Sequence, residues 1–345
     1  MPRSAAAAAT VLCLAMAGAS AATEDGPWWE NEPLRIIQTN LRQIDADRDP
    51  AVIVEQVKDL GANTILFSCG GIRAFYQTDL KYHKKAIALD GDFAVEARRI
   101  ARVQGLRFIG RLDLSKAHAG FREDNPDWFQ RGADGVSHEY NGLHVACPNG
   151  TYYRDYSHEI IKEVIERIEP DALFFNMFGF TRHDYSGAEI ALCHCKGCQA
   201  RYKELNGAPL PRDMGPEHPE YGKYQGFQRE SIRTLVDELK GLIHRESGGK
   251  TAFFTYVDSA DMRRMEANSG LSRRPRTNFF SAAQQVGRFK TMYPDKPVGC
   301  TAVNFLDMPY RYSSEPAGLT GMRLVQALAV GGELDFYVLG TLDQP

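Results

Sequence analysis

The chain has 345 residues, of which 43% are hydrophobic and 25% are charged, and its formal net charge is −3. This composition is typical of a globular protein that buries a sizeable core. The small negative charge and the lack of a basic run argue against nucleic acid or an acidic membrane surface as a partner.

The N-terminus has the pattern of a secretory signal peptide. A basic start at Arg3 precedes an alanine-rich apolar stretch, and an A-x-A cleavage site follows at residues 19–21. The alternative is a membrane anchor, but the stretch is shorter than the ~20 residues that span a bilayer. We therefore expect residues 1–22 to be removed, leaving residues 23–345 as a secreted or periplasmic domain without a membrane span.

Short runs typical of strands alternate with amphipathic helices along the rest of the chain. Most of the runs are continuously apolar, as in strands that are buried on both faces. The helices carry apolar residues at helical spacing. The predicted strands are residues 34–41, 63–68, 107–114, 172–178, 251–257, 262–266, 298–305 and 334–339, and the predicted helices are residues 51–60, 93–103, 153–168, 227–245, 281–292 and 316–330.

Eight such strands predict an α/β protein with a single (β/α)8 TIM barrel. The competing interpretation is a doubly wound open sheet, but that sheet usually has fewer strands, and no glycine-rich dinucleotide fingerprint follows the first strand. The sequence stops at Pro345, directly after the eighth strand. We therefore expect a barrel that is truncated before its eighth helix, either as a fragment or with another element closing it.

Four of the cysteines have the spacing of metal ligands. Residues 193–198 contain a C-x-C-x-x-C run after the fourth strand, and Cys147 lies in the loop after the third. Disulfides at such short spacing are strained, whereas four thiolates suit one tetrahedral zinc ion and leave no position for water. We predict a structural zinc with a disulfide as the alternative, and His194 as an alternative ligand; Cys69 and Cys300 fall in strands and are expected to be buried thiols. The predicted zinc ligands are Cys147, Cys193, Cys195 and Cys198.

These motifs resemble those of known glycosidases. The run at 147–154 (CPNGTYYR), the strand ALFFN and the C-x-C-x-x-C run are similar to glycoside hydrolase family 42, retaining β-galactosidases whose zinc loop is held by four cysteines. The segments at 69–71, 111–116, 265–268 and 340–343 are closer to the hypothetical glycosyl hydrolase 6 barrels, a group that includes the α-L-fucosidases of family 151. The resemblance implies a glycosidase acting on an α-L-fucoside or β-galactoside. Such proteins normally continue into a trimerisation domain that does not follow here, which leaves a homo-oligomer open.

Two carboxylates follow barrel strands and are candidates for catalysis. Glycoside hydrolysis usually uses two carboxyl groups across one bond, and in a TIM barrel catalytic groups lie at the C-terminal ends of the strands. Asp113 ends the third strand two residues after Arg111, so both point the same way and Arg111 can hold Asp113 ionised. We predict Glu266, after the sixth strand, as general acid/base, and Asp113 as the second carboxylate or a substrate anchor. The alternatives are a structural ion pair at Asp113 and a surface position for Glu266, because the adjacent Arg263 and Arg264 have a solvated pattern.

The family 42 acid has no counterpart in this chain. In that family a glutamate follows the asparagine that ends the fourth strand, whereas here Asn176 is followed by Met177, which cannot transfer a proton. The family 42 mechanism therefore does not carry over, and a non-catalytic carbohydrate-binding barrel is the second hypothesis. We interpret Asn176 as a sugar-hydroxyl ligand, with a buried structural amide as the alternative. Tyr256, Asp258 and Arg311, together with Arg111, complete the predicted substrate-binding set.

Overall fold

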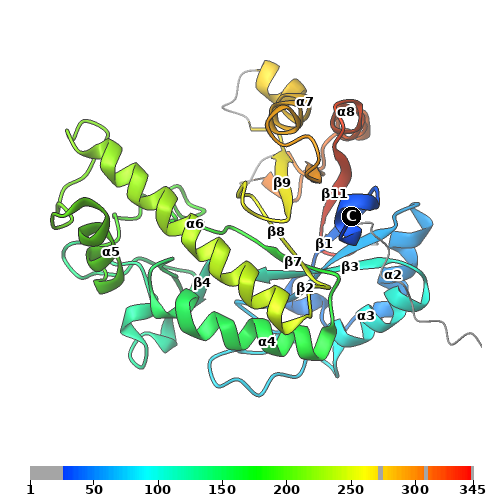
Figure 1. The fold of residues 1–345 in the computed structure, drawn as a ribbon. Coiled ribbons are helices and arrows are strands. Elements are labelled where there is room, and N and C mark those ends of the chain that lie inside the picture. The colour runs from blue at the N-terminus through cyan, green and yellow to red at the C-terminus, as the bar shows by residue number, and fades with distance from the viewer. Residues whose placement is uncertain (1–25, 271–274, 307–309, 343–345) are drawn as a thin grey trace, which may run out of the picture.

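The computed structural model describes residues 26–270, 275–306 and 310–342. The predicted signal peptide lies outside these residues. Eight parallel strands close into a barrel in the order β1-β11-β10-β9-β8-β7-β3-β2 (Figure 1). Ile37 of β1 pairs with Ile65 of β2 on one side and with Phe336 of β11 on the other, which closes the ring. The predicted TIM barrel is confirmed.

The barrel strands match the runs predicted from the sequence to within a few residues. All are short and most are largely buried, although β11 is mostly half-buried. The C-terminal ends of all eight lie at the same end of the barrel because the strands are parallel. The strands are β1 (Arg35–Asn40), β2 (Thr64–Gly71), β3 (Arg107–Asp113), β7 (Ala172–Phe175), β8 (Ala252–Thr255), β9 (Met262–Ala267), β10 (Val298–Val303) and β11 (Glu333–Leu339).

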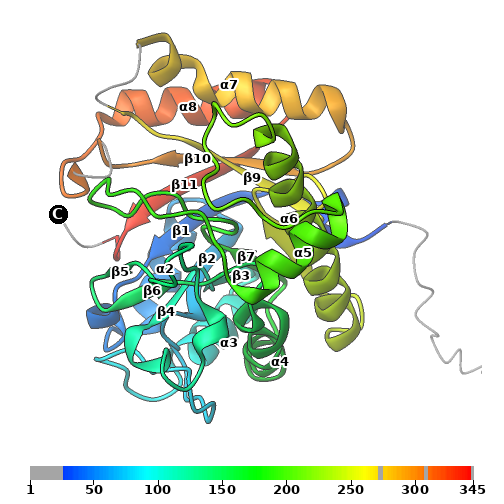
Figure 2. The same ribbon diagram turned by 90° about the vertical axis from the view of Figure 1, so that its left-hand side faces the viewer.

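Helices cover the outside of the barrel. The helix α2 begins where Asp49 caps the amide of Ala51 and Pro50 occupies the first turn. Figure 1 shows α4 and α6 side by side, and Figure 2 shows α7 and α8 together over β9, β10 and β11. The helices are α1 (Trp28–Asn31), α2 (Pro50–Asp59), α3 (Phe93–Val103), α4 (Ser157–Ile168), α5 (Lys196–Asn206), α6 (Tyr221–Glu246), α7 (Pro275–Met292) and α8 (Ala317–Ala329). None of these helices is long and apolar enough to cross a lipid bilayer.

The βα loops carry elements that the sequence did not predict. A small antiparallel sheet of β4 (Lys116–His118), β6 (Leu143–Val145) and β5 (Glu139–Tyr140) follows β3, and α5 follows β7. These strands are two or three residues long, which is too short for an alternating pattern to be recognised in the sequence. The helix α5 is mostly polar and buries only Cys198 and Tyr202, so it lacks an apolar stripe.

The interior of the barrel changes from apolar to polar along the strands. Ile36, Ile109, Phe174 and Phe254 fill its N-terminal half, and Trp29 packs against the same cluster. Since side chains on one face of a strand recur every two residues, the next inward positions are those two and four residues further on. These positions carry Gln38, Asn40, Arg111, Asn176 and Tyr256, which places a polar layer at the C-terminal end.

Candidate functional site

A cavity of about 230 Å³ lies at the C-terminal ends of the barrel strands. This is the end at which active sites of TIM-barrel enzymes are built. Residues of β1, β3, β9, β10 and β11, and of the segments that follow β7, β8, β9 and β10, supply its walls. The lining residues are Gln38, Asn40, Arg111, Asn176, Met177, Tyr185, Tyr256, Arg264, Glu266, Asn268, Val303, Phe305, Arg311 and Tyr337.

Glu266 is the only carboxylate among the described residues that line the cavity. It lies on β9, two residues after Arg264, so the two side chains share the inward face. Its Oε1 accepts a hydrogen bond of 3.0 Å from the hydroxyl of Tyr256. Burial, and then the charge of Glu266, raise the pKa of Tyr256 well above its usual value, so the phenol stays protonated and donates to the carboxylate. The alternative surface position for Glu266 is wrong.

Asp113 lies behind the cavity wall and does not line it. Its Oδ2 accepts a hydrogen bond of 2.8 Å from Nδ2 of Asn176 and lies 3.4 Å from a terminal nitrogen of Arg111. Burial alone would raise the pKa of Asp113, but the charges of Arg111 and Lys116 and hydrogen bonds from Ser115 and Asn176 outweigh it and lower the pKa. Asp113 therefore contacts two residues of the wall, Asn176 and Arg111, from behind it.

Arg264 is a buried part of the site, and its interpretation as solvated is wrong. Its side chain is 2% exposed and makes two hydrogen bonds to Asp335, of 2.7 and 3.0 Å. Thr301 donates a third hydrogen bond to the same carboxylate, and the guanidinium stacks on the ring of Phe174. The sequence signal for this pair was Asp335, an acidic residue within the apolar run that follows Glu333 in the eighth strand.

Of the remaining predicted substrate ligands, two line the cavity and one, Asp258, does not. Tyr256 and Arg311 line the cavity, and the guanidinium of Arg311 stacks over the ring of Tyr185. Asp258 does not reach the cavity: its side chain is 45% exposed and pairs with Arg263. The chain leaves the barrel at residues 256–261, so the two-residue spacing no longer keeps Asp258 on the face of Tyr256.

Met177, which follows Asn176 after β7, has an uncommon backbone conformation. Its φ is +48°, a value that non-glycine residues adopt rarely and mostly at functional sites. The hydroxyl of Tyr185 lies 2.8 Å from its sulfur, and Nζ of Lys116 lies 3.8 Å from the same atom. Two protonated groups thus surround a side chain that cannot transfer a proton.

Three further polar residues of the wall, Gln38, Asn40 and Tyr337, were not predicted from the sequence. Gln38 is 3% exposed, and its Oε1 has no partner among the described residues. Asn40 donates a hydrogen bond of 2.6 Å to the hydroxyl of Tyr337. The first two stand two residues apart at the end of an otherwise apolar strand, which is the pattern that would have revealed them.

The four predicted cysteines come together in one buried cluster. Their sulfur atoms all lie within 4.8 Å of one another, and Sγ of Cys147 is 3.3, 3.6 and 3.4 Å from those of Cys198, Cys193 and Cys195. Tetrahedral zinc with Zn–S bonds of ~2.3 Å would separate its sulfurs by roughly 3.8 Å, so the cluster fits a metal after a small expansion. The structure has all four as free cysteines, and the cluster does not include His194. Cys69 and Cys300 are buried thiols, as predicted.

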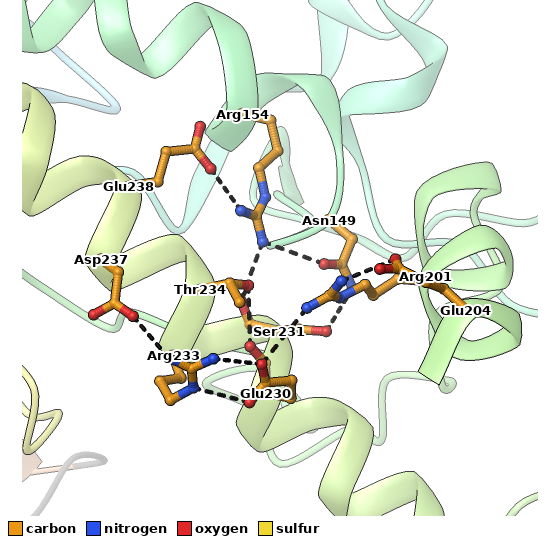
Figure 3. A network of polar contacts seen from close by, with 10 residues as sticks. All are labelled: Asn149, Arg154, Arg201, Glu204, Glu230, Ser231, Arg233, Thr234, Asp237 and Glu238. Atoms are coloured by element: carbon orange, nitrogen blue, oxygen red, sulfur yellow. Dashed lines mark hydrogen bonds and ion pairs between the residues drawn. The ribbon is translucent and has the colours of Figure 1, made fainter. Parts of the chain in front are cut away.

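A polar network ties this cluster to α6 (Figure 3). Nδ2 of Asn149 lies 3.5 Å from Sγ of Cys198 and 3.1 Å from the hydroxyl of Ser231. Arg154 pairs with Glu238 at 2.6 Å and donates to the carbonyl of Ser231. The loops that carry the cysteines are thereby fixed to α6, and none of the four cysteines lines the cavity that holds Glu266.

The fold and the site can now be compared with known proteins. Residues 49–177 match the family described as hypothetical glycosyl hydrolase 6. The matched segment contains β2, β3 and β7, and with them Arg111, Asp113 and Asn176. The resemblance predicted from the sequence is confirmed. The chain matches none of the curated proteins.

Solved structures of glycosidases share the fold at low identity. An α-L-fucosidase isoenzyme 2 from Paenibacillus thiaminolyticus is 14% identical with a TM-score of 0.63, over 90% of this chain and 47% of that one. A β-galactosidase from Bacillus circulans sp. alkalophilus is 12% identical with a TM-score of 0.61, over 89% of this chain and 50% of that one. A β-galactosidase from Rahnella sp. R3 is 14% identical with a TM-score of 0.62, over 90% of this chain and 51% of that one. The chain thus spans about half the length of these enzymes.

Proposed function

We propose that the protein is a glycoside hydrolase whose reacting carboxylate is Glu266. The observation that carries this proposal is a single carboxylate in a polar cavity at the catalytic end of a TIM barrel. The match to a glycosyl hydrolase family and the shared fold of an α-L-fucosidase and two β-galactosidases support a saccharide as the substrate. An α-L-fucoside or a β-galactoside is the first substrate to test.

We assign distinct roles to the residues that surround Glu266 in the cavity wall. Tyr256 holds Oε1 by its hydrogen bond, which fixes the carboxylate for attack on the anomeric carbon or for accepting a proton from water. Asn176 and Gln38, which both line the cavity, are the ligands for sugar hydroxyls. Asp113 acts through Asn176 and Arg111 as a positioning residue, not as a second carboxylate in contact with the sugar.

A screen of aryl glycosides tests the proposal directly. The purified protein is incubated with aryl α-L-fucoside, β-galactoside and a panel of other aryl glycosides, and release of the phenol is followed. We expect turnover of at least one member. If none is cleaved while free sugars still bind, the non-catalytic carbohydrate-binding barrel is favoured, and Met177 in place of the family 42 acid is the observation behind that second candidate.

We also propose that the four-cysteine cluster holds a structural zinc ion. Four sulfurs leave no open position on a tetrahedral ion, so the metal would stabilise the loops and take no part in hydrolysis. Its ligands would be Cys147, Cys193, Cys195 and Cys198, whose thiols already converge.

Export is proposed from the sequence pattern of residues 1–22. The test is the N-terminal sequence of the protein recovered from a secreting host. A mature chain that begins near residue 23 supports export, and a chain that keeps its first residues in the cytoplasm contradicts it.

A further inference from the structure

The cavity holds Glu266 but no second carboxylate among the described residues that line it. Cleavage of a glycosidic bond usually needs a proton for the departing oxygen as well as a group that assists at the anomeric carbon. Met177 has no proton to give, and Asp113 does not line the cavity. The proton for the leaving group therefore has to come from another residue of the wall.

Three tyrosine hydroxyls line the cavity, and they differ in what they contact and in how exposed they are. The hydroxyl of Tyr256 donates to Oε1 of Glu266 at 3.0 Å, so this proton is already engaged. The hydroxyl of Tyr337 accepts a hydrogen bond of 2.6 Å from Asn40. Tyr256 and Tyr337 are half-buried, whereas Tyr185 is 46% exposed. Tyr185 is therefore the tyrosine at the opening of the cavity, which is where a leaving group departs.

Tyr185 lies at the tip of a short hairpin that follows β7. A bridge between His183 and Glu189 closes the hairpin, and the backbone nitrogen of Asp184 donates to the carbonyl of Ala188. Gly187 has a φ of +87°, the left-handed conformation that glycine adopts at no steric cost and that completes the turn. The hairpin thus holds the ring of Tyr185 against the wall by its backbone.

The hydroxyl of Tyr185 has a weak acceptor. It donates to the sulfur of Met177 at 2.8 Å, and a thioether sulfur is a poor hydrogen-bond acceptor. Partial burial, and then the charge of Asp113, raise the pKa of Tyr185, although Arg311 and Arg111 act in the opposite direction. The phenol is therefore protonated at neutral pH, and an oxygen atom that approaches it is a better acceptor than the sulfur.

Two cations contact the ring of Tyr185. Nζ of Lys116 lies 5.2 Å from the ring centroid, and the guanidinium of Arg311 lies 5.1 Å from it. Positive charge at this distance favours a phenolate over a phenol. The two cations therefore stabilise the anion that remains after Tyr185 has lost its proton.

We propose that Tyr185 is the catalytic acid that protonates the leaving oxygen, and that Lys116 and Arg311 stabilise its phenolate. This inference rests on the proposed function, and it adds the proton donor for the leaving group. Glu266 keeps its role at the anomeric carbon or on the attacking water.

The proposed step balances in atoms and electrons. The glycosidic C–O bond breaks and its electron pair goes to the leaving oxygen, which takes the phenolic proton and departs as an alcohol. As the bond breaks, the oxygen of a departing sugar or alkyl alcohol becomes more basic than a phenolate, so the transfer is favourable. The water that replaces the leaving group gives its hydroxyl to the anomeric carbon. Its proton returns to the phenolate, either directly or through Glu266 and solvent.

The dependence of the rate on the leaving group tests this proposal. The wild type and Tyr185→Phe are assayed on the methyl, phenyl and dinitrophenyl glycosides of the sugars in the screen. Dinitrophenolate is weakly basic and leaves without a proton. In Tyr185→Phe we expect kcat/KM to fall about 10²-fold or more on the methyl and phenyl glycosides and less than about threefold on the dinitrophenyl glycoside.

A variant of a second tyrosine of the wall provides the matched control. Tyr337→Phe also removes a hydroxyl from the cavity, and it should lower kcat/KM by the same factor for every leaving group. Unfolding temperature and binding of the free sugar are measured for both variants. Tyr185→Phe should keep both properties, because phenylalanine retains the ring that the two cations contact.

Lys116→Met gives a second readout that leaves the hydroxyl of Tyr185 in place. It removes one of the two cations, so it should slow cleavage of the methyl and phenyl glycosides more than cleavage of the dinitrophenyl glycoside. This variant keeps the proposal testable if Tyr185→Phe does not fold.

The outcomes separate this inference from the proposed function. If the wild type cleaves glycosides and Tyr185→Phe slows all leaving groups by one factor, or slows none, the inference is overturned and the hydrolase proposal stands. A dependence on the leaving group that appears in Tyr337→Phe instead also overturns it. If the wild type cleaves no glycoside, both proposals fail together.

Discussion

Asn176 donates a hydrogen bond of 2.8 Å to the carboxylate of Asp113, and this contact links the buried charge to a residue of the cavity wall. The carboxylate stays out of the cavity, while the amide lines it. An acidic residue predicted from its place at a strand end can therefore act one contact away from the substrate.

The acid stability of the protein should depend on Asp113. Its pKa in the folded chain is lowered, whereas an aspartate in the unfolded chain titrates near pH ~3.9. The unfolded state therefore binds more protons near this pH, so the stabilisation is present above about pH 4 and is lost as the pH falls through the folded pKa. We expect Asp113→Asn to lower stability at pH 7 and to flatten the loss of stability below about pH 4, measured by urea unfolding at several pH values.

The exposed Asp47 provides the control for this titration. Asp47→Asn should leave both the stability at neutral pH and the acid dependence as they are in the wild type. An Asp113→Asn protein with an unchanged acid dependence would contradict the assignment of an ionised, paired carboxylate.

Glu266→Gln should abolish hydrolysis while leaving sugar binding intact. The amide keeps the shape of the side chain but cannot attack carbon or accept a proton, so kcat on the best aryl glycoside should fall by about 10²–10⁴-fold or more. Binding of the corresponding free sugar is measured in parallel by calorimetry. Glu159→Gln, on the exposed face of α4, is the matched control. Retention of kcat in Glu266→Gln would remove this residue from the mechanism.

The barrel could be predicted because its signals are local. Eight apolar runs separated by amphipathic helices require only the strand and helix periods, and all eight strands were located. The places of Glu266, Arg111 and Asn176 in the cavity wall follow from one further rule, that functional groups lie at strand ends. That rule gives the end of the barrel at which a residue lies. It does not tell whether the side chain lines the cavity or lies behind the residues that do, and Asp113 is of the second kind.

The errors arise where a distant partner or a turn of the chain overrides the local sequence pattern. The pair Arg263-Arg264 has the sequence pattern of a solvent-exposed segment. Arg264 is nevertheless buried, because Asp335, 71 residues away in sequence, compensates its charge. Asp258 follows Tyr256 at the right spacing, but the chain turns away from the barrel between them. Neither relationship is encoded in the neighbouring residues.

The purified protein should contain about one zinc ion per chain. Cys195→Ser should lose this metal and unfold at a lower temperature, because metal binding contributes free energy of folding. Cys300→Ala, which removes a buried thiol outside the cluster, should keep the metal despite the small cavity that it creates. Metal content is measured by atomic emission and unfolding by calorimetry. A wild type without metal whose cluster cysteines resist alkylation would contradict the zinc proposal.

Gly197 should be intolerant of any side chain. A Cβ at this position would lie 2.0 Å from the carbonyl oxygen of Asn149, so the loops bearing Cys147 and Cys198 could not approach as they do. Gly197→Ala should therefore reduce the zinc content and the unfolding temperature together. Gly222→Ala on α6, where a Cβ meets nothing within 4 Å, should do neither. Equal zinc content in the two variants would show that the close approach is not required.

Breaking the buried pair of Arg264 and Asp335 from one side should be more damaging than removing both charges. Arg264→Met leaves Asp335 uncompensated in the barrel interior, where it is 0% exposed, and should cost about 3–5 kcal/mol in the free energy of unfolding. The double variant Arg264→Met/Asp335→Leu has no buried charge at this position and should recover most of that loss, with the remainder reflecting the hydroxyl of Thr301. Arg102→Met, at an exposed ion pair, should cost less than about 1 kcal/mol. Urea unfolding of the wild type, Arg264→Met, Asp335→Leu and the double variant gives the coupling energy. A double variant as unstable as the sum of its two single variants would mean that the two charges do not stabilise each other.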